Sequence, residues 1–77
     1  HGAEVVPYSC RLLRGGHVKL ALRSGSREFP AIGFQMGDYY ETLRHAELVD
    51  AAFTPQFNTY RRETSIQLVL KDIRPAE

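Results

Sequence analysis

The sequence predicts an all-β domain with one short helix in its second half. Apolar and polar residues alternate cleanly over 17–24, which is the period of a strand with one buried face. Turn-forming stretches, "RGG" at 14–16 and "SGSR" at 24–27, divide the chain into segments of strand length. The period becomes helical over 38–45. These three observations favour a small β-barrel interrupted by a helix.

The elements follow in the order β-β-β-α-β-β. Strands are predicted at 4–13, 17–24, 28–34, 48–54 and 64–73, with a helix at about 38–45 and Asp38 as its N-cap. Residues 55–63, "PQFNTYRRE", are predicted to be a loop or the flared ends of a hairpin. Five short strands with a helix between the third and fourth predict an OB-fold, a five-stranded Greek-key barrel, over residues 4–75. An SH3-like barrel is the alternative, although it normally lacks a helix at that place.

Strand parity predicts which side chains form the core. The predicted inward residues are Val18, Leu20, Leu22, Val49, Phe53, Ile66, Leu68 and Leu70. Phe34 continues the parity of Ile32 and is predicted to lie in the core, and Cys10 is also predicted to face inward.

Composition limits the possible classes of protein. The chain has 77 residues, which is enough for one domain. A single cysteine excludes a disulfide within the chain, and no histidine has metal-ligand spacing to it. No apolar run approaches the length of a membrane span. The chain does not begin with Met, so we expect it to be a piece of a longer protein.

The charge distribution is more informative than the net charge of +1. Residues 11–27 hold five basic residues and no acidic one, whereas residues 28–50 hold five acidic residues and one arginine. Such asymmetry produces a one-sided potential that steers a polyanion. The alternative interpretation is that these arginines bind no ligand and only keep a small domain soluble.

In an OB-fold, the second and third strands and the loops joining strands one to two and four to five form the ligand face. The predicted nucleic-acid-binding residues at these places are Arg14, His17, Lys19, Arg23, Arg27, Tyr60, Arg61 and Arg62. A basic groove beside aromatic faces is what single-strand binding without sequence preference requires. Tyr60 is the predicted stacking residue, and Phe34 and Phe57 are weaker candidates.

Two other classes compete with this prediction. One is a protein-interaction barrel whose basic face binds an acidic partner. The other is a small independent hydrolase. The aspartates Asp38, Asp50 and Asp72 are isolated from the histidines, so the sequence predicts no catalytic site and no cofactor.

Three stretches in order suggest a family. "GGHVKLAL", "AIGFQMG" and "VDAAFTPQFNTYRRETSIQLVLKDIRP", within residues 15–75, together resemble the C-terminal OB domain of the RecJ family. The family's "SlQL" segment matches 65–68, which adds Gln67 to the candidate binding residues. Thr59 stands where an acid is usual, and Tyr60 where Trp or Phe is common. The family's loop glycine is missing near Arg61 and Arg62.

The resemblance implies a parent enzyme that degrades single-stranded DNA from the five-prime end in bacterial DNA repair and recombination. Such an enzyme uses Mn²⁺ or Mg²⁺ in motifs that this chain lacks. The domain would hold the strand for the catalytic domains of the parent chain. The expected partners are therefore single-stranded DNA and those domains, with no membrane, in a monomeric cytoplasmic protein.

Overall fold

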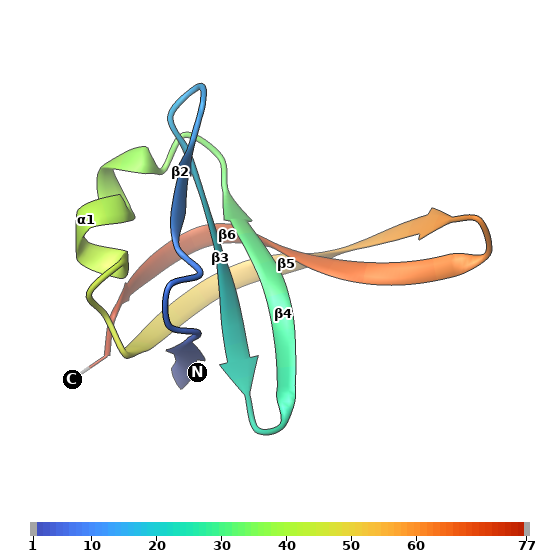
Figure 1. The fold of residues 1–77 in the computed structure, drawn as a ribbon, viewed down its shortest axis with the longest axis horizontal. Coiled ribbons are helices and arrows are strands. Elements are labelled where there is room, and N and C mark those ends of the chain that lie inside the picture. The colour runs from blue at the N-terminus through green and yellow to red at the C-terminus, as the bar shows by residue number, and fades with distance from the viewer. Residues whose placement is uncertain (1, 77) are drawn as a thin grey trace.

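The computed structural model describes residues 2–76 as a small body of curved strands from which one long hairpin projects (Figure 1). The elements are β1 Gly2–Val5, β2 Arg11–Leu13, β3 His17–Ser24, β4 Arg27–Gly33, the 3-10 turn η1 Gly37–Tyr39, the helix α1 Tyr40–Leu43, β5 Leu48–Tyr60 and β6 Glu63–Pro75. This all-β architecture, with one short helix between β4 and β5, agrees with the predicted OB-like fold.

The first predicted strand is divided into β1 and β2. Pro7 lies in the turn between them and cannot donate to a ladder. The side chain of Ser9 takes over part of that ladder, because its Oγ accepts a hydrogen bond from Ala21 N at 3.0 Å. Val6 N donates to Ala21 O at 3.0 Å. The β1–β2 connection therefore remains joined to β3 although it is not a strand.

All strands belong to one sheet in the order β1-β5-β6-β4-β3-β2. β1 pairs with β5 through Ala3↔Val49 and, on its other side, with β3 through Val5↔Leu22. β4 and β6 are parallel, and the other pairings are antiparallel. The two ends of the five-strand series β1-β5-β6-β4-β3 are thus joined by hydrogen-bonded pairing.

Pro30 explains why β6 leaves β4 after a short contact. Ala21, which faces Pro30 across β3 and β4, directs its backbone groups to Ser9 and Val6 instead of to β4. The Ala21–Pro30 pair is therefore a non-hydrogen-bonded pair, and the missing N–H of Pro30 lies on the β6 side. The β4–β6 ladder stops beside it after two residue pairs.

The core contains most of the residues that strand parity predicted. Its buried members are Val5, Val18, Leu20, Leu22, Ala31, Leu43, Val49, Leu68, Leu70 and Ile73. Ile66 and Cys10 are only partly buried and pack against this cluster. The prediction for Phe53 was wrong, since its side chain is 45% exposed. Its side chain lies on the inward side of β5, but at this residue β5 extends beyond the core.

Of the two alternatives for 55–63, the structure shows the ends of a hairpin and not a loop. β5 continues to Tyr60 and β6 begins at Glu63, so only Arg61 and Arg62 form the turn. Pro55 suggested a strand break. Hydrogen-bonded and non-hydrogen-bonded pairs alternate along the hairpin from its two-residue turn, and the pair of Pro55 with Leu68 is a non-hydrogen-bonded one. The position where Pro55 lacks an N–H therefore faces the open edge of β5, and no hydrogen bond between β5 and β6 is lost.

The short helical segment lies close to where it was predicted. η1 and α1 together cover 37–43, and the side chain of Leu43 is fully buried against the sheet. Asp38 does not act as the predicted N-cap, because neither η1 nor α1 has a capping side-chain hydrogen bond. Burial of one apolar side chain, and not capping, fixes this segment.

Candidate nucleic-acid interface

Side chains on β2, β3 and β4 that alternate with the core residues form an exposed surface, here called the outer face. Its members are Arg11, Leu13, His17, Lys19, Ala21, Arg23, Glu28, Pro30, Ile32 and Phe34. Val18, Leu20 and Leu22 are buried on the opposite side of β3. This places His17, Lys19 and Arg23 on one surface, as their parity predicted.

The centre of the outer face holds two like charges in register. Arg11 on β2 is directly opposite Lys19 on β3, and both side chains are exposed. Within residues 2–76, neither forms an ion pair with a carboxylate. Like charges at opposed positions destabilise a sheet. An anion bound between them would relieve this repulsion.

Arg11 was not among the predicted binding residues. It belongs to the basic segment of 11–27, but its place beside Lys19 depends on the register of β2 against β3. Counting back from the "RGG" turn could have given that register, because Leu13 pairs with His17 across it.

A shallow groove of about 360 Å³ lies beside this basic pair. Its lining comprises Ser9, Arg11, Lys19, Leu20, Ala21, Glu28, Phe29 and Pro30. The small pair of Ala21 and Pro30 crosses the outer face between larger side chains. Lys19 and Arg11 give one part of the groove a positive charge, while Glu28 adds a negative charge elsewhere.

Arg23 is already neutralised within the chain. Its guanidinium lies 3.0 Å from Glu28 Oε2 and 3.7 Å from Glu4 Oε2. Arg14 is exposed in the turn before β3, and Arg27 is exposed at the start of β4, directly after the turn that follows β3. Of the predicted arginines around β3, these two keep their charge available to a ligand, whereas Arg23 does not.

Phe34 is exposed, contrary to the prediction that it lies in the core. Its side chain is 54% exposed. Its parity with Ile32 is as expected, but these two residues follow the outer face, because Ala31 and Gly33 face Leu20 and Val18 inside. At this end of β4, small residues thus pack opposite large ones on β3, which places Ile32 and Phe34 on the outer side, whereas Phe29 packs against the core opposite Leu22.

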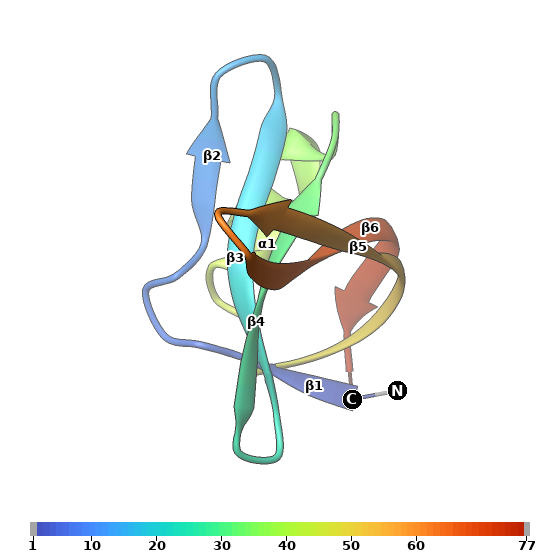
Figure 2. The same cartoon turned by 90° about the vertical axis from the view of Figure 1, so that its right-hand side faces the viewer.

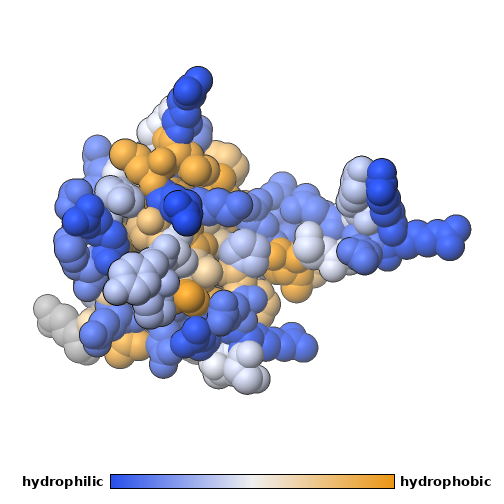
Figure 3. All heavy atoms as spheres, viewed as in Figure 1, coloured by the Kyte–Doolittle hydropathy of each residue, from blue (hydrophilic) through white to orange (hydrophobic). Residues whose placement is uncertain are grey.

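His17 lies against this phenylalanine. The two ring centroids are 5.4 Å apart and the rings are nearly perpendicular, at 78°. The Nδ1 atom of His17 accepts a hydrogen bond from the backbone N–H of Gln35 at 2.8 Å. Apolar surface gathers around this end of β2 and β3, below the hydrophilic β2–β3 turn (Figure 3). Leu12, 55% exposed, belongs to the same end of the body.

The outer face continues onto the projecting part of β5 and β6, residues 53–67, here called the arm. Ile32 pairs with Val69 on β6, and Val69 pairs with Thr54 on β5. The side of the arm that carries Thr54 is polar apart from one aromatic ring. It carries Thr54, Gln56, Asn58, Tyr60, Glu63, Ser65 and Gln67. The predicted residues Tyr60 and Gln67 therefore share a surface with Lys19 by register.

The opposite side of the arm carries an apolar stripe of Phe53, Pro55, Phe57 and Ile66. It continues the inward parity of the core beyond the point where the body ends. Phe57 is 65% exposed. Since Phe57 and Tyr60 lie on opposite sides of the arm, these two stacking candidates cannot contact bases along one surface.

The tip of the arm holds the remaining predicted residues. Arg61 and Arg62 have positive φ angles of 51° and 68°, and the guanidinium carbon of Arg61 lies 5.2 Å from the centroid of the Tyr60 ring. The expectation that this connection folds over the outer face was wrong. The arm points away from the body (Figure 1), and a view from the tip of the arm shows β2, β3 and β4 next to one another behind it (Figure 2).

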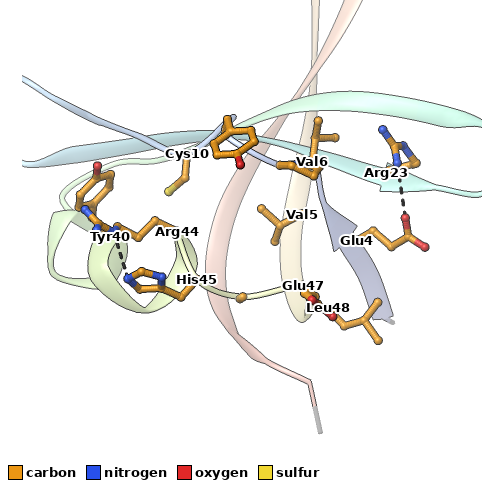
Figure 4. Close-up of a pocket in the computed structure, with 13 residues that line it drawn as sticks. Glu4, Val5, Val6, Cys10, Arg23, Tyr40, Arg44, His45, Glu47 and Leu48 are labelled. Atoms are coloured by element: carbon orange, nitrogen blue, oxygen red, sulfur yellow. Dashed lines mark hydrogen bonds and ion pairs between the residues drawn. The ribbon is translucent and has the colours of Figure 1, made fainter.

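A second, larger hollow of about 930 Å³ lies between the β1–β2 connection and α1 (Figure 4). It contains acidic Glu4 and Glu47 as well as basic Arg44. Burial raises the pKa of the Cys10 thiol above its ordinary value, and nearby Arg44 opposes this in part. A thiol that holds its proton is a poor nucleophile, and the mixed charge does not favour a polyanion. This hollow is therefore not the nucleic-acid site.

No three His, Cys, Asp or Glu side chains among residues 2–76 are gathered so that they could hold a metal ion. No helix there has the length and apolar character needed to cross a membrane.

Comparisons with known proteins were made for the whole chain. No curated protein and no solved structure matches it. A family model, described as the RecJ OB domain, matches residues 2–72. This match covers all of the described strands except the end of β6. The chain therefore belongs to the RecJ OB domain family.

Proposed function

We propose that this chain binds single-stranded DNA along its outer face and the polar side of its arm. The observation that carries the proposal is the exposed Arg11–Lys19 pair, two like charges in register with no carboxylate partner among residues 2–76. Phosphates would neutralise both charges. The polar arm and Tyr60 would then supply hydrogen bonds and one stacking surface to the rest of the strand.

The binding would be independent of sequence. The outer face offers charge and aromatic rings, and η1 and α1 cover only 37–43, which is too short for a recognition helix in a major groove. As in other OB-folds, we place the ligand across the central strands. The pairing of β1 with both β3 and β5 supports a closed five-stranded barrel beneath this surface.

Membership of the RecJ OB family supports a role within a larger enzyme. We propose that the domain retains the strand near the catalytic domains of a RecJ-like single-strand exonuclease in bacterial DNA repair and recombination. Retention raises the effective concentration of the strand at the catalytic site. The described residues of this chain offer no ligand set for Mn²⁺ or Mg²⁺, so the metals would be held by the parent's other domains.

Competition between single and double strands tests the proposal. A labelled oligo-dT bound to the chain should be displaced by unlabelled oligo-dT, and much less by a duplex of the same length, because paired bases cannot stack on an exposed ring. Equal displacement by both would contradict it. If neither oligo-dT nor the duplex binds, and an acidic protein binds tightly, the protein-interaction alternative would be favoured.

A further inference from the structure

We propose that Phe34 is a base-stacking residue of this interface and that His17 is the residue that positions it. This inference rests on the proposed single-strand binding. Strand parity predicted Phe34 for the core and left it only a weaker stacking candidate, yet the structure places it on the outer face and more than half exposed. The free chain thus leaves an aromatic surface in water that a stacked base would cover.

The ring of Phe34 is held in place from one side. His17 meets it nearly at right angles, with 5.4 Å between the ring centroids, which is a favoured geometry for two aromatic rings. His17 is itself oriented, because its Nδ1 accepts the N–H of Gln35 at 2.8 Å. The neutral imidazole in this arrangement carries its proton on Nε2. One hydrogen bond therefore fixes the histidine, and the histidine supports the phenylalanine.

The backbone around Phe34 is also fixed. Gly33 is packed so closely that a Cβ atom would lie 2.8 Å from Met36 Sδ and 3.2 Å from Val18 Cγ1. Gln35 has a positive φ of 57°, and Gly37 N donates to Gly16 O at 2.8 Å. This last bond ties the segment after β4 to the β2–β3 turn. The ring is thus ordered before a ligand arrives, which lowers the entropy cost of stacking.

Phe34 also lies near basic side chains that could contact the phosphates of a bound strand. His17 and Lys19 are alternate residues of β3 on the outer face, about 7 Å apart along the strand. Arg14 is exposed in the turn that leads into His17. A strand whose base stacks on Phe34 would therefore have basic side chains beside its phosphates. This combination of an ordered ring and neighbouring charge distinguishes Phe34 from Phe57 on the opposite side of the arm.

The test compares oligo-dT with an abasic strand of the same length, which keeps the phosphates but has no bases. Phe34→Ala should weaken oligo-dT binding about 5-fold to 160-fold, the range given by one lost base–aromatic contact. It should leave abasic-strand binding and the salt dependence unchanged. Phe34→Trp should retain affinity for oligo-dT. Phe57→Ala is the matched control, because it removes an exposed phenylalanine from the other surface, and it should change neither affinity.

His17→Ala tests the positioning role. It should weaken oligo-dT binding but not abasic-strand binding, and in that background Phe34→Ala should cost less than in the unaltered chain. If the losses in oligo-dT affinity caused by His17→Ala and Phe34→Ala simply add in the double variant, His17 does not position Phe34. Unchanged oligo-dT binding by Phe34→Ala, while the unaltered chain binds oligo-dT in a salt-dependent way, would overturn this inference alone. No binding by the unaltered chain would overturn the proposed function as well.

Discussion

Arg61 and Arg62 close the arm with a backbone conformation that arginine rarely adopts. Both φ angles are positive, as a two-residue hairpin turn of type I′ requires, and Asn-Gly is the usual sequence there. A residue other than Gly, Asn or Asp in this region costs of order 1 kcal/mol or more. The turn thus carries two positive charges where local stability would favour small residues.

Arg62→Gly should therefore stabilise the tip of the arm, by about 1 kcal/mol, while it removes a charge. Because the arm can open without the body, amide hydrogen exchange at Asn58 and Ser65, which form a hydrogen-bonded pair near the tip, is the suitable measurement, and exchange should slow about fivefold. Arg74→Gly, in the extended part of β6, is the control and should destabilise its strand. Faster exchange in Arg62→Gly would show that the turn is not strained.

The core residues are where sequence parity was most reliable. Leu20 is 2% exposed at the centre of the cluster, and Leu20→Ala should cost about 2–5 kcal/mol by removal of buried methyl groups and the cavity that remains. Urea unfolding measures this cost. An unchanged midpoint would contradict the assignment of Leu20 to the core.

At the scale of elements, the sequence left the arm undecided between a loop and the ends of a hairpin. Pro55 and Asn58 are common loop residues, and nothing in a local pattern distinguishes a loop from two strands that pair only with each other. Phe53 was misplaced for the same reason, since parity gives a side of the strand but not the point where the body ends. Phe34 was misplaced because the choice of inner side on β4 depends on its packing against β3.

The arm should be separable from the stability of the body. Replacement of residues 57–66 by Asn-Gly would join Gln56 to Gln67, which already face each other as a hydrogen-bonded pair, by a favoured turn. The removed side chains are exposed apart from Ile66, so the melting temperature should fall far less than in Leu20→Ala. Thermal unfolding measures this. Loss of cooperative unfolding would show that the arm is part of the folding unit.

For the whole molecule, the all-β class, the helix position and the charge asymmetry could all be predicted from the sequence. Alternation, turn residues and composition are local, and they determine these properties directly. The path of the ligand surface could not be predicted, because it depends on registers between strands distant in the sequence. Arg11 joins Lys19 through one such register, and Tyr60 shares their surface through two others.

The central claim is that the outer face and the arm bind one strand together. It can be tested with a variant in which Lys19, Arg61 and Arg62 are all changed to alanine. Each lost phosphate contact should lower the slope of log K against log salt for a single strand by roughly 0.7. The melting temperature should hold, because exposed charges contribute little to stability.

The control removes two charges elsewhere, by changing Arg44 and Arg74 to alanine. The slope should stay near that of the unaltered chain, because Arg44 follows α1 and Arg74 lies near the end of β6, outside the outer face and the arm. Tyr60→Ala is a second control. It should weaken binding by about 1–3 kcal/mol through lost stacking, with little change in slope.

The most direct measurement is thus the titration of the unaltered chain, the triple variant and its charge control with oligo-dT at several salt concentrations. The account predicts that the slope falls by about two units in the variant lacking Lys19, Arg61 and Arg62, and stays unchanged in the control. An unchanged slope in the first variant, or an equal fall in both, would contradict a shared path across the outer face and the arm.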